Sequence, residues 1–449
     1  MQITEASADG LKHTFKVVIP AQDIETKVQS RLAELAKTAH LPGFRPGKAP
    51  MAVIKGRYGL SARGEVLEDL VNDSSSALVR ERGLRPALQP RIEADGEYKE
   101  GQDFGYSLTV ESLPDIEPMD FAALTLERLV APVDDADLSA ALERLAQARR
   151  TSKALEEPRP AQSGDTVVID FKGTVNGESH PGLNADGYYV ILGSGTFIDS
   201  FESQLEGASS GEHRTVNVTF PDDYGSPEFA GKAAVFAVDV KEVRETVTPV
   251  VDDELAKEIG LDDLETLKLR FRERLERDRA DASRQRLKRG LLDILAEKHD
   301  FPVPEGMVEI EFRGIWQQLE QELAKQGGLK VEDSGRSEDA VKAEYRTIAE
   351  RRVRLGLLLS EVGTRHKIEV SDAEINQAMF AEVRRYPGYE RNLLEYYGKN
   401  PRAKDRFRIP VFEDKVVDLI LESAQISEKT VSMDELMRDP DADESPQAA

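Results

Sequence analysis

The sequence of 449 residues contains no cysteine, which excludes disulfide bonds, thiolate metal sites and cysteine nucleophiles. Its six histidines are scattered without an H-E-x-x-H pattern or a close pair, so catalytic zinc is not expected. No segment approaches the roughly 18 apolar residues of a membrane helix, and the first residues, MQITEASADG, lack the basic and apolar regions of an export signal. These absences predict a soluble intracellular protein that needs no cofactor or metal.

Charge is strongly unbalanced, because 84 Asp and Glu face 60 Lys and Arg and leave a net charge of −24. Nucleic-acid binding depends on clustered cations, so a general DNA-binding protein is not expected. The imbalance is not uniform: residues 1–113 carry 15 basic and 16 acidic side chains, and residues 1–60 alone carry nine against five. Nearly all the acidic excess therefore lies downstream. The length indicates about three domains.

Residues 1–113 have the pattern of an α+β domain. Alternating apolar residues (Phe15, Val17 and Ile19) predict a half-buried strand over 11–19, and alternation returns over 104–113. Apolar residues at helical spacing between them predict helices over 21–39 and 51–82.

Residues 114–162 are rich in proline, which favours an extended linker. Asp134 can cap one helix within it, running to Arg149, whose apolar stripe should pack on the C-terminal domain. Residues 163–247 contain short strand-like runs separated by turns, including an Asn176-Gly177 hairpin signal, and one short helical candidate over 199–207. This pattern favours a curved antiparallel sheet that wraps one short helix.

Residues 248–427 predict an all-α domain with extended helical arms. The expected helices cover 262–298, 305–326, 337–366, 371–384, 389–397 and 402–424. The polar and apolar stripes on these helices, with exposed Tyr386, Tyr389, Tyr396 and Tyr397, could hold unfolded chains, or the stripes could simply pack helix on helix. Residues 428–449 hold seven acidic and two basic residues and predict a disordered acidic tail.

The segment GFRPGKAP (residues 43–50) must be a loop, because its glycines and prolines prevent helix or strand. This loop lies between two predicted helices and contains one aromatic residue, Phe44. It also contains the cations Arg45 and Lys48, which could bind a surface of carboxylate or phosphate groups. Two interpretations stay open: a docking loop, or an ordinary helix–helix turn with Phe44 folded inward.

The segment resembles the ribosome-docking signature of bacterial trigger factors, and the order of regions along the whole chain resembles that family too. The resemblance implies a cytoplasmic, partly ribosome-bound chaperone of nascent and unfolded polypeptides, with roles in protein folding, protein transport and cell division. Gly43, Phe44, Arg45 and Lys48 would contact protein and rRNA of the large ribosomal subunit beside the exit tunnel. A homodimer off the ribosome is possible, and neither DNA nor a membrane is an expected partner.

Segments 164–173, 193–202 and 219–224, with Phe236, resemble FKBP-type peptidyl-prolyl isomerases in order and spacing. Rotation about an X–Pro bond has a barrier of about 18–20 kcal/mol but needs no acid, base or metal. A dry aromatic pocket would suffice, since it favours the less hydrated, twisted amide. The resemblance implies that Phe201 is the pocket floor and that the Ile198 N–H holds the substrate carbonyl. The implied walls are Phe171, Phe197, Ile198, Tyr224, Phe236 and, less clearly, Tyr188. From the residues alone, the same side chains could form an ordinary core.

One departure from the FKBP pattern is Glu178-Ser-His180-Pro181, where the family commonly has an aromatic residue followed by an acid. It leaves open an alternative, a non-enzymatic holdase with a degenerate isomerase domain. A free isomerase-chaperone of the export pathway is a third possibility, but it would need a signal sequence and no docking loop.

Overall fold

A computed structural model describes residues 2–38, 40, 44, 48–96, 98–175, 177–198, 200–221, 224–226, 229–325, 331 and 336–439. The chain divides into two compact units, residues 1–128 with 285–429 and residues 129–284 with 430–449. Within the described ranges, no helix combines the length and apolar character needed to cross a membrane. The multidomain α+β class predicted from the sequence is confirmed.

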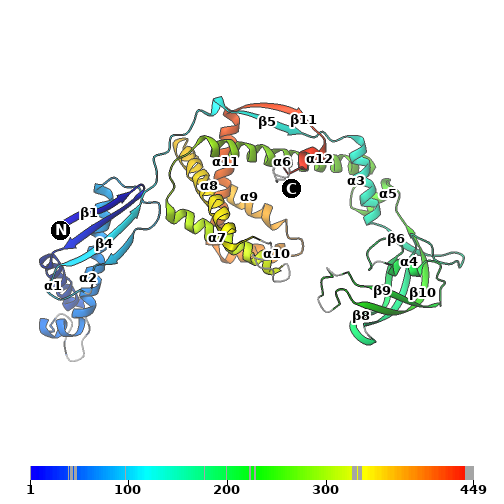
Figure 1. Ribbon diagram of the computed structural model, residues 1–449, viewed down its shortest axis with the longest axis horizontal. Helices are drawn as coiled ribbons and strands as arrows, with labels where there is room; N and C mark the ends of the chain where they lie inside the picture. The colour runs from blue at the N-terminus through cyan, green and yellow to red at the C-terminus, as the bar shows by residue number, and fades with distance from the viewer. Residues whose placement is uncertain are drawn as a thin grey trace. The chain divides into compact units, whose positions relative to one another are not determined.

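Residues 1–112 of the first unit form an antiparallel sheet with two helices (Figure 1). The strand order is β1 (Gln2–Asp9), β2 (Lys12–Ile19), β4 (Phe104–Glu111) and β3 (Arg91–Ala94). Helices α1 (Ala21–Thr38) and α2 (Met51–Glu81) pack on it, and the alternating Phe15, Val17 and Ile19 of β2 share a core with Ile24 and Val28 of α1. The sequence correctly predicted this core.

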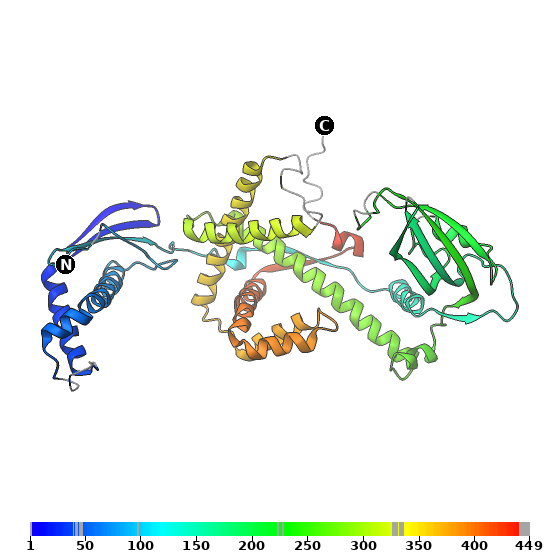
Figure 2. The same cartoon turned by 90° about the horizontal axis from the view of Figure 1, so that it is seen from below.

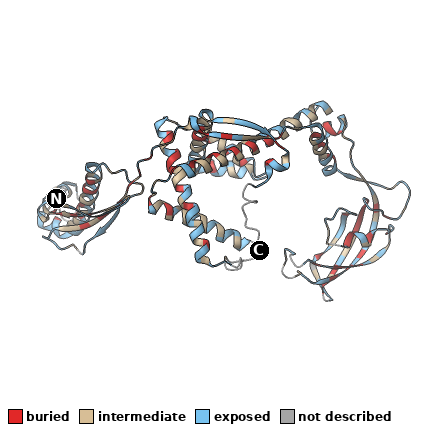
Figure 3. Ribbon diagram, turned by 45° about the horizontal axis from the view of Figure 1, so that its top comes forward, coloured by how far each residue is buried: buried red, intermediate tan, exposed pale blue. Residues whose placement is uncertain are grey.

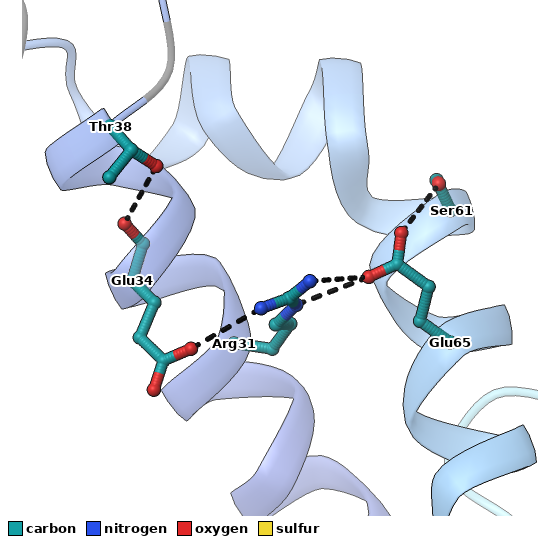
Figure 4. Close-up of polar contacts among 5 residues, drawn as sticks. All are labelled: Arg31, Glu34, Thr38, Ser61 and Glu65. Atoms are coloured by element: carbon teal, nitrogen blue, oxygen red, sulfur yellow. Dashed lines mark hydrogen bonds and ion pairs between the residues drawn. The ribbon is translucent and has the colours of Figure 1, made fainter.

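An ion-pair cluster joins the helices on either side of the 39–50 segment (Figure 4). The Arg31 guanidinium of α1 contacts the Glu65 carboxylate of α2 at 2.9 Å and the Glu34 carboxylate at 3.4 Å. Because these groups are exposed to water, each pair contributes little to stability by itself. Together they help fix the spacing of α1 and α2.

The remaining part of the first unit is helical. Its helices are α7 (Glu305–Lys325), α8 (Glu338–Arg365), α9 (Asp372–Val383), α10 (Glu390–Lys399), η3 (Pro401–Phe407), α11 (Arg408–Ser423) and the second half of α6 (Leu264–Lys298). Figure 2 shows α6 as one continuous helix, as the sequence predicted. Leu291, Leu358, Val416 and Ile420 lie at the centre of the core that α6, α8 and α11 share.

The flanking segments differ from the prediction in two ways. Residues 125–130 form β5 (Thr125–Val130), so this part of the linker is extended, as predicted, but it is paired with β11 (Gln425–Thr430). The tail is ordered through residue 439 and contains α12 (Met433–Met437), because Val431 and Leu436 bury their side chains with Ala131. A few apolar residues thus suffice to order an acidic segment. Residues 440–449 lie outside the described residues.

In the second unit, the predicted linker helix is α3 (Asp135–Ala148), which begins with a capping box at Asp134. Leu138 and Leu142 of α3 pack on Ala256 of α5 (Asp253–Glu258) and on Leu267 at the start of α6. These partners lie in the range predicted to be the C-terminal domain, but they belong to the second unit.

A curved five-stranded antiparallel sheet forms the rest of the second unit. Its order is β6 (Thr151–Ala154), β10 (Ala233–Val247), β7 (Thr166–Val175) and β8 (Glu178–Ile191), with β9 (His213–Thr219) also paired to β10. Buried and exposed residues alternate along β10 (Figure 3), and its register with β7 shifts between Val240 and Glu242. The short helix α4 (Phe201–Leu205) lies against the buried face through Phe201 and Leu205. The curved sheet with one short helix is therefore as predicted.

Candidate functional site

An aromatic cluster (Phe171, Tyr188, Phe197, Phe201 and Phe236) lies where α4 meets the sheet. The Phe171 ring on β7 is its centre and makes edge-to-face contacts with the four other rings at centroid distances of 5.8 to 6.3 Å. Phe197 also stacks on Phe201 at 4.8 Å. Edge-to-face and stacked rings of this kind form a rigid apolar wall.

The deep side of the cluster is fixed by sheet register and by a glycine. Phe201 begins α4 and Phe236 lies on β10, and both side chains are buried. Gly173 pairs with Phe236 across the strands, and a Cβ at Gly173 would lie 2.6 Å from the Phe236 ring and 2.7 Å from the Leu183 Cβ. Only glycine therefore admits the Phe236 ring at this place.

The outer side of the cluster reaches solvent. Phe171, Phe197 and Ile198 are partly buried against the same core, while Tyr188 is 46% exposed. Tyr188 contacts both Phe171 at 5.9 Å and Phe197 at 5.4 Å. The structure thus gives Tyr188 a clearer place in the cluster than the sequence did.

Tyr224 is the predicted wall residue that the structure places in a different group. Within the described ranges, its ring contact is with Phe220 at 4.7 Å, and Phe220 stacks on Phe229. The His180 ring contacts Phe229 at 5.2 Å. The candidates Phe171, Phe197, Ile198, Phe201 and Phe236 therefore come together, whereas Tyr224 belongs with Phe220, Phe229 and His180.

Glu202, which the sequence analysis did not select, organises the loop that carries Phe197 and Ile198. Its buried carboxylate accepts hydrogen bonds from the backbone N–H groups of Gly195, Thr196 and Phe197 at 3.0, 3.0 and 3.1 Å and from the Ser194 hydroxyl at 3.0 Å. Burial by itself raises the pKa of Glu202, but the hydrogen bonds outweigh it and hold the pKa below its usual value. A charged carboxylate therefore fixes the outer wall of the cluster.

The backbone N–H of Ile198 has no hydrogen-bond partner among the residues that the structure describes. It follows directly on the loop that Glu202 holds. A donor in this position is available to a bound carbonyl group.

The predicted docking loop is described only in part. The Phe44 side chain is 40% exposed, so its ring is neither fully buried nor fully exposed to solvent. Lys48 is exposed. Gly43 and Arg45 lie outside the described residues. Their role stays a prediction.

In the helical part of the first unit, Tyr386, Tyr389 and Tyr396 are exposed as predicted, but Tyr397 is not. The Tyr397 ring is buried against Phe407 at 5.6 Å, and the Arg406 guanidinium lies 5.2 Å from its centroid. The prediction of an exposed Tyr397 was wrong because successive helical residues point about 100° apart. Tyr396 and Tyr397 therefore face solvent and core respectively.

No three His, Asp or Glu side chains within the described ranges come close enough together to hold a metal ion.

An antiparallel sheet curved around a short helix, with this aromatic cluster between them, defines an FKBP-type peptidyl-prolyl isomerase domain. Residues 157–241 match the family model described as FKBP-type peptidyl-prolyl cis-trans isomerase. Residues 1–145 match the model of bacterial trigger factor protein, and residues 263–422 match that of the trigger factor C-terminus. The chain belongs to the trigger factor family.

Similar proteins cover the chain from end to end. The trigger factor of Rhodospirillum centenum is 55% identical over all of both chains, and that of Azospirillum brasilense is 53% identical over 98% of this chain and 99% of its own. A solved structure from work on promiscuous substrate recognition by the trigger factor chaperone has 20% identity and a TM-score of 0.54. It covers 94% of this chain and 99% of its own and supports the fold. Family and fold together make this chain a ribosome-associated chaperone with an FKBP-type isomerase domain.

Proposed function

We propose that this protein works in the cytoplasm, docks on the large ribosomal subunit through residues 43–48, and isomerises X–Pro bonds of emerging chains at the aromatic cluster. The observation that carries the isomerase assignment is the combination of a five-ring cluster open to solvent on one side and an adjacent Ile198 N–H that has no partner among the described residues. The docking assignment rests on the family match over residues 1–145.

In this proposal, a substrate proline ring lies on Phe201 and Phe236, and Phe197 and Tyr188 shield it from water. The Ile198 N–H holds the carbonyl that precedes the proline while the amide twists. Because the twisted amide is less hydrated than the planar one, the apolar walls lower the rotation barrier. The fixed position of Ile198 avoids an ordering cost during the reaction, since Glu202 already holds the preceding loop.

A protease-coupled assay with an Ala-Leu-Pro-Phe type peptide tests the isomerase assignment. We expect cis-to-trans conversion faster than the uncatalysed background. A rate equal to background would reject the assignment and favour the alternative of a non-enzymatic holdase. That alternative is supported by His180, whose ring packs on Phe229 where the family commonly has another side chain.

Ribosome co-sedimentation tests the docking assignment. Replacing Phe44, Arg45 and Lys48 together with alanine should abolish pelleting with ribosomes, because the aromatic and cationic contacts are lost. A matched control is the alanine replacement of Arg91, Ile92 and Lys99, which removes one exposed apolar residue and the same two cations from elsewhere in residues 1–112. Equal pelleting of both variants would refute the docking role of residues 43–48.

A further inference from the structure

Strand β8 contains an extra residue just before Tyr188. Tyr188 pairs with Ile169 of β7. Ala185 pairs with Phe171, so three steps along β8 match two steps along β7. Residues three apart on a regular strand point to opposite faces, because side chains alternate. The bulge at residues 186–187 corrects this alternation and brings the Tyr188 ring to the aromatic cluster, where it contacts Phe171 at 5.9 Å.

The carboxylate of Asp170 holds this bulge. Asp170 is the β7 residue opposite the bulge, and its Oδ1 accepts a hydrogen bond of 2.7 Å from the backbone N–H of Gly187. Gly187 has a φ of 65°, in the left-handed region that glycine adopts without a steric cost. The hydrogen bond therefore fixes the residue directly before Tyr188.

A second bulge meets Asp170 from the other side of β7. The register of β10 with β7 shifts between Val240 and Glu242, which leaves Lys241 as the extra residue. The Lys241 Nζ lies 2.7 Å from Asp170 Oδ2. The hydrogen bond from Lys241, followed by the one from Gly187, holds the pKa of Asp170 below its usual value, so the carboxylate is charged at neutral pH. One side chain thus joins the two strands that flank β7.

We propose that Asp170 is a positioning residue of the isomerase site, because its bond to Gly187 directs Tyr188 over the aromatic cluster. The Asp170 side chain leaves β7 on the face opposite to that of Phe171, so it acts through the bulge rather than by contact with the substrate. The inference rests on the proposed function, in which Tyr188 shields the substrate proline from water. It extends the site to a residue on the outer face of the sheet.

A double-mutant cycle with the full chain tests this role. Asp170→Ala should lower kcat/KM about fivefold in the protease-coupled assay, because Tyr188 is no longer held in place. Tyr188→Ala should lower kcat/KM by at least as much. The double variant should be no worse than Tyr188→Ala, since Asp170 acts through that ring. Losses that multiply would show that Asp170 acts by another route, and would overturn the proposal.

Three further variants separate positioning from a general loss of structure. Asp170→Asn keeps an oxygen that can accept the Gly187 N–H and should retain activity within about twofold of the wild type. Lys241→Met leaves the same hydrogen bond in place and should have a similarly small effect. The matched control is Asp239→Ala, because Asp239 stands opposite Asp170 in the register of β10 with β7 but pairs with His213. A loss in this control equal to that of Asp170→Ala would contradict the assignment.

Hydrogen exchange of the Gly187 amide in the full chain measures the contact itself. Protection of this amide should be lost in Asp170→Ala and retained in Asp170→Asn and Asp239→Ala. Unchanged protection in Asp170→Ala would show that the carboxylate does not hold the bulge, and would reject the inference. Denaturant unfolding establishes that each variant is folded under the assay conditions.

The activity of the wild type separates failure of the inference from failure of the proposed function. A wild-type rate equal to background would reject the isomerase assignment. The same cycle is then measured as dissociation constants for a fluorescein-labelled Ala-Leu-Pro-Phe peptide, with the same expected order of variants. A wild-type rate above background, together with an unchanged rate in Asp170→Ala, would reject the role of Asp170 alone.

Discussion

The backbone N–H of Phe197 donates a hydrogen bond of 3.1 Å to the carboxylate of Glu202, five residues further along the chain. This bond links the Phe197 side of the aromatic cluster to α4, whose first residue, Phe201, carries the buried ring on which Phe197 stacks. The two stacked rings are thus positioned by adjacent residues, Phe201 and Glu202.

Glu202→Gln should lower both stability and isomerase activity. The amide NH₂ would face the N–H of Gly195, which leaves a buried donor unpaired and costs about 2 kcal/mol in the free energy of unfolding. We expect kcat/KM to fall about tenfold because Ile198 is no longer held in place. Denaturant unfolding and the protease-coupled assay measure the two effects. Glu206→Gln, at an exposed carboxylate just after α4, is the control and should change neither quantity.

Phe197→Leu should reduce activity far more than stability. The Phe197 side chain is only partly buried, so its replacement leaves the deep core of Phe201 and Phe236 intact, but it removes the ring that contacts Tyr188. A decrease of about tenfold in kcat/KM with a cost below about 1.5 kcal/mol in stability is expected. Tyr189→Leu, one residue from Tyr188 and 58% exposed, is the matched control. Equal activity of the two variants would argue against a wall at Phe197.

Gly173→Ala should destabilise the isomerase domain by about 1–3 kcal/mol, because the new Cβ overlaps the Phe236 ring. The displaced ring should also weaken peptide binding. Gly182→Ala on the neighbouring strand introduces a Cβ that meets no atom within 4 Å and should be tolerated. Thermal unfolding of both variants checks this prediction, and similar melting temperatures would contradict it.

Acid should loosen the start of α9. The hydrogen bond from Lys415, together with those from Ser371, lowers the pKa of Glu374 from 4.5 to about 2. A carboxyl with a lowered pKa stabilises the folded state above its unfolded pKa, and this contribution is lost as the pH falls from 4.5 towards 2. Hydrogen-exchange protection at Ile375 and Met379, corrected for intrinsic rates, should fall across this range. In Lys415→Met, the folded pKa of Glu374 is less depressed, so the loss should be smaller and should be complete at a higher pH. A loss of unchanged size and range would show that Lys415 does not set this pKa.

The sequence predicted the helices that bury one apolar stripe against elements close to them in the chain. The helical spacing of apolar residues located α1, α2 and α6 to α10 closely, because each buries one stripe on its neighbours. The helix predicted over 402–424 is instead the 3-10 helix η3 (Pro401–Phe407) followed by α11 (Arg408–Ser423). The strand β1 was missed, since Ile3 is its only large apolar residue and most of the strand is exposed at the edge of the sheet. Edge strands without alternation leave no periodic signal.

Long-range relationships could not be predicted in the same way. Nothing local in residues 425–430 indicates that they pair with residues 125–130, so the end of the chain was expected to be disordered. The contact of Tyr224 with Phe220 rather than with Phe171 depends on packing that the sequence pattern does not encode. The role of Glu202 becomes visible only when the N–H groups of residues 195–197 are seen to converge on one carboxylate. The sequence did contain one indication of this role: Glu202 directly follows Phe201, which was predicted to be buried. A carboxylate that is buried beside such a residue needs hydrogen-bond donors.

The pairing of β5 with β11 has a consequence for the biosynthesis of this chaperone. Residues 1–112 bury their own core and can fold as soon as they leave the ribosome, whereas β5 must wait until residue 430 has been synthesised before it finds its partner. A newly made molecule can therefore complete the core of residues 1–112 first and pair β5 with β11 last. During that interval the unpaired strand β5 and the apolar faces of the unfinished helical domain are exposed to solvent. The protein is then prone to aggregation, as are the unfolded chains that it binds.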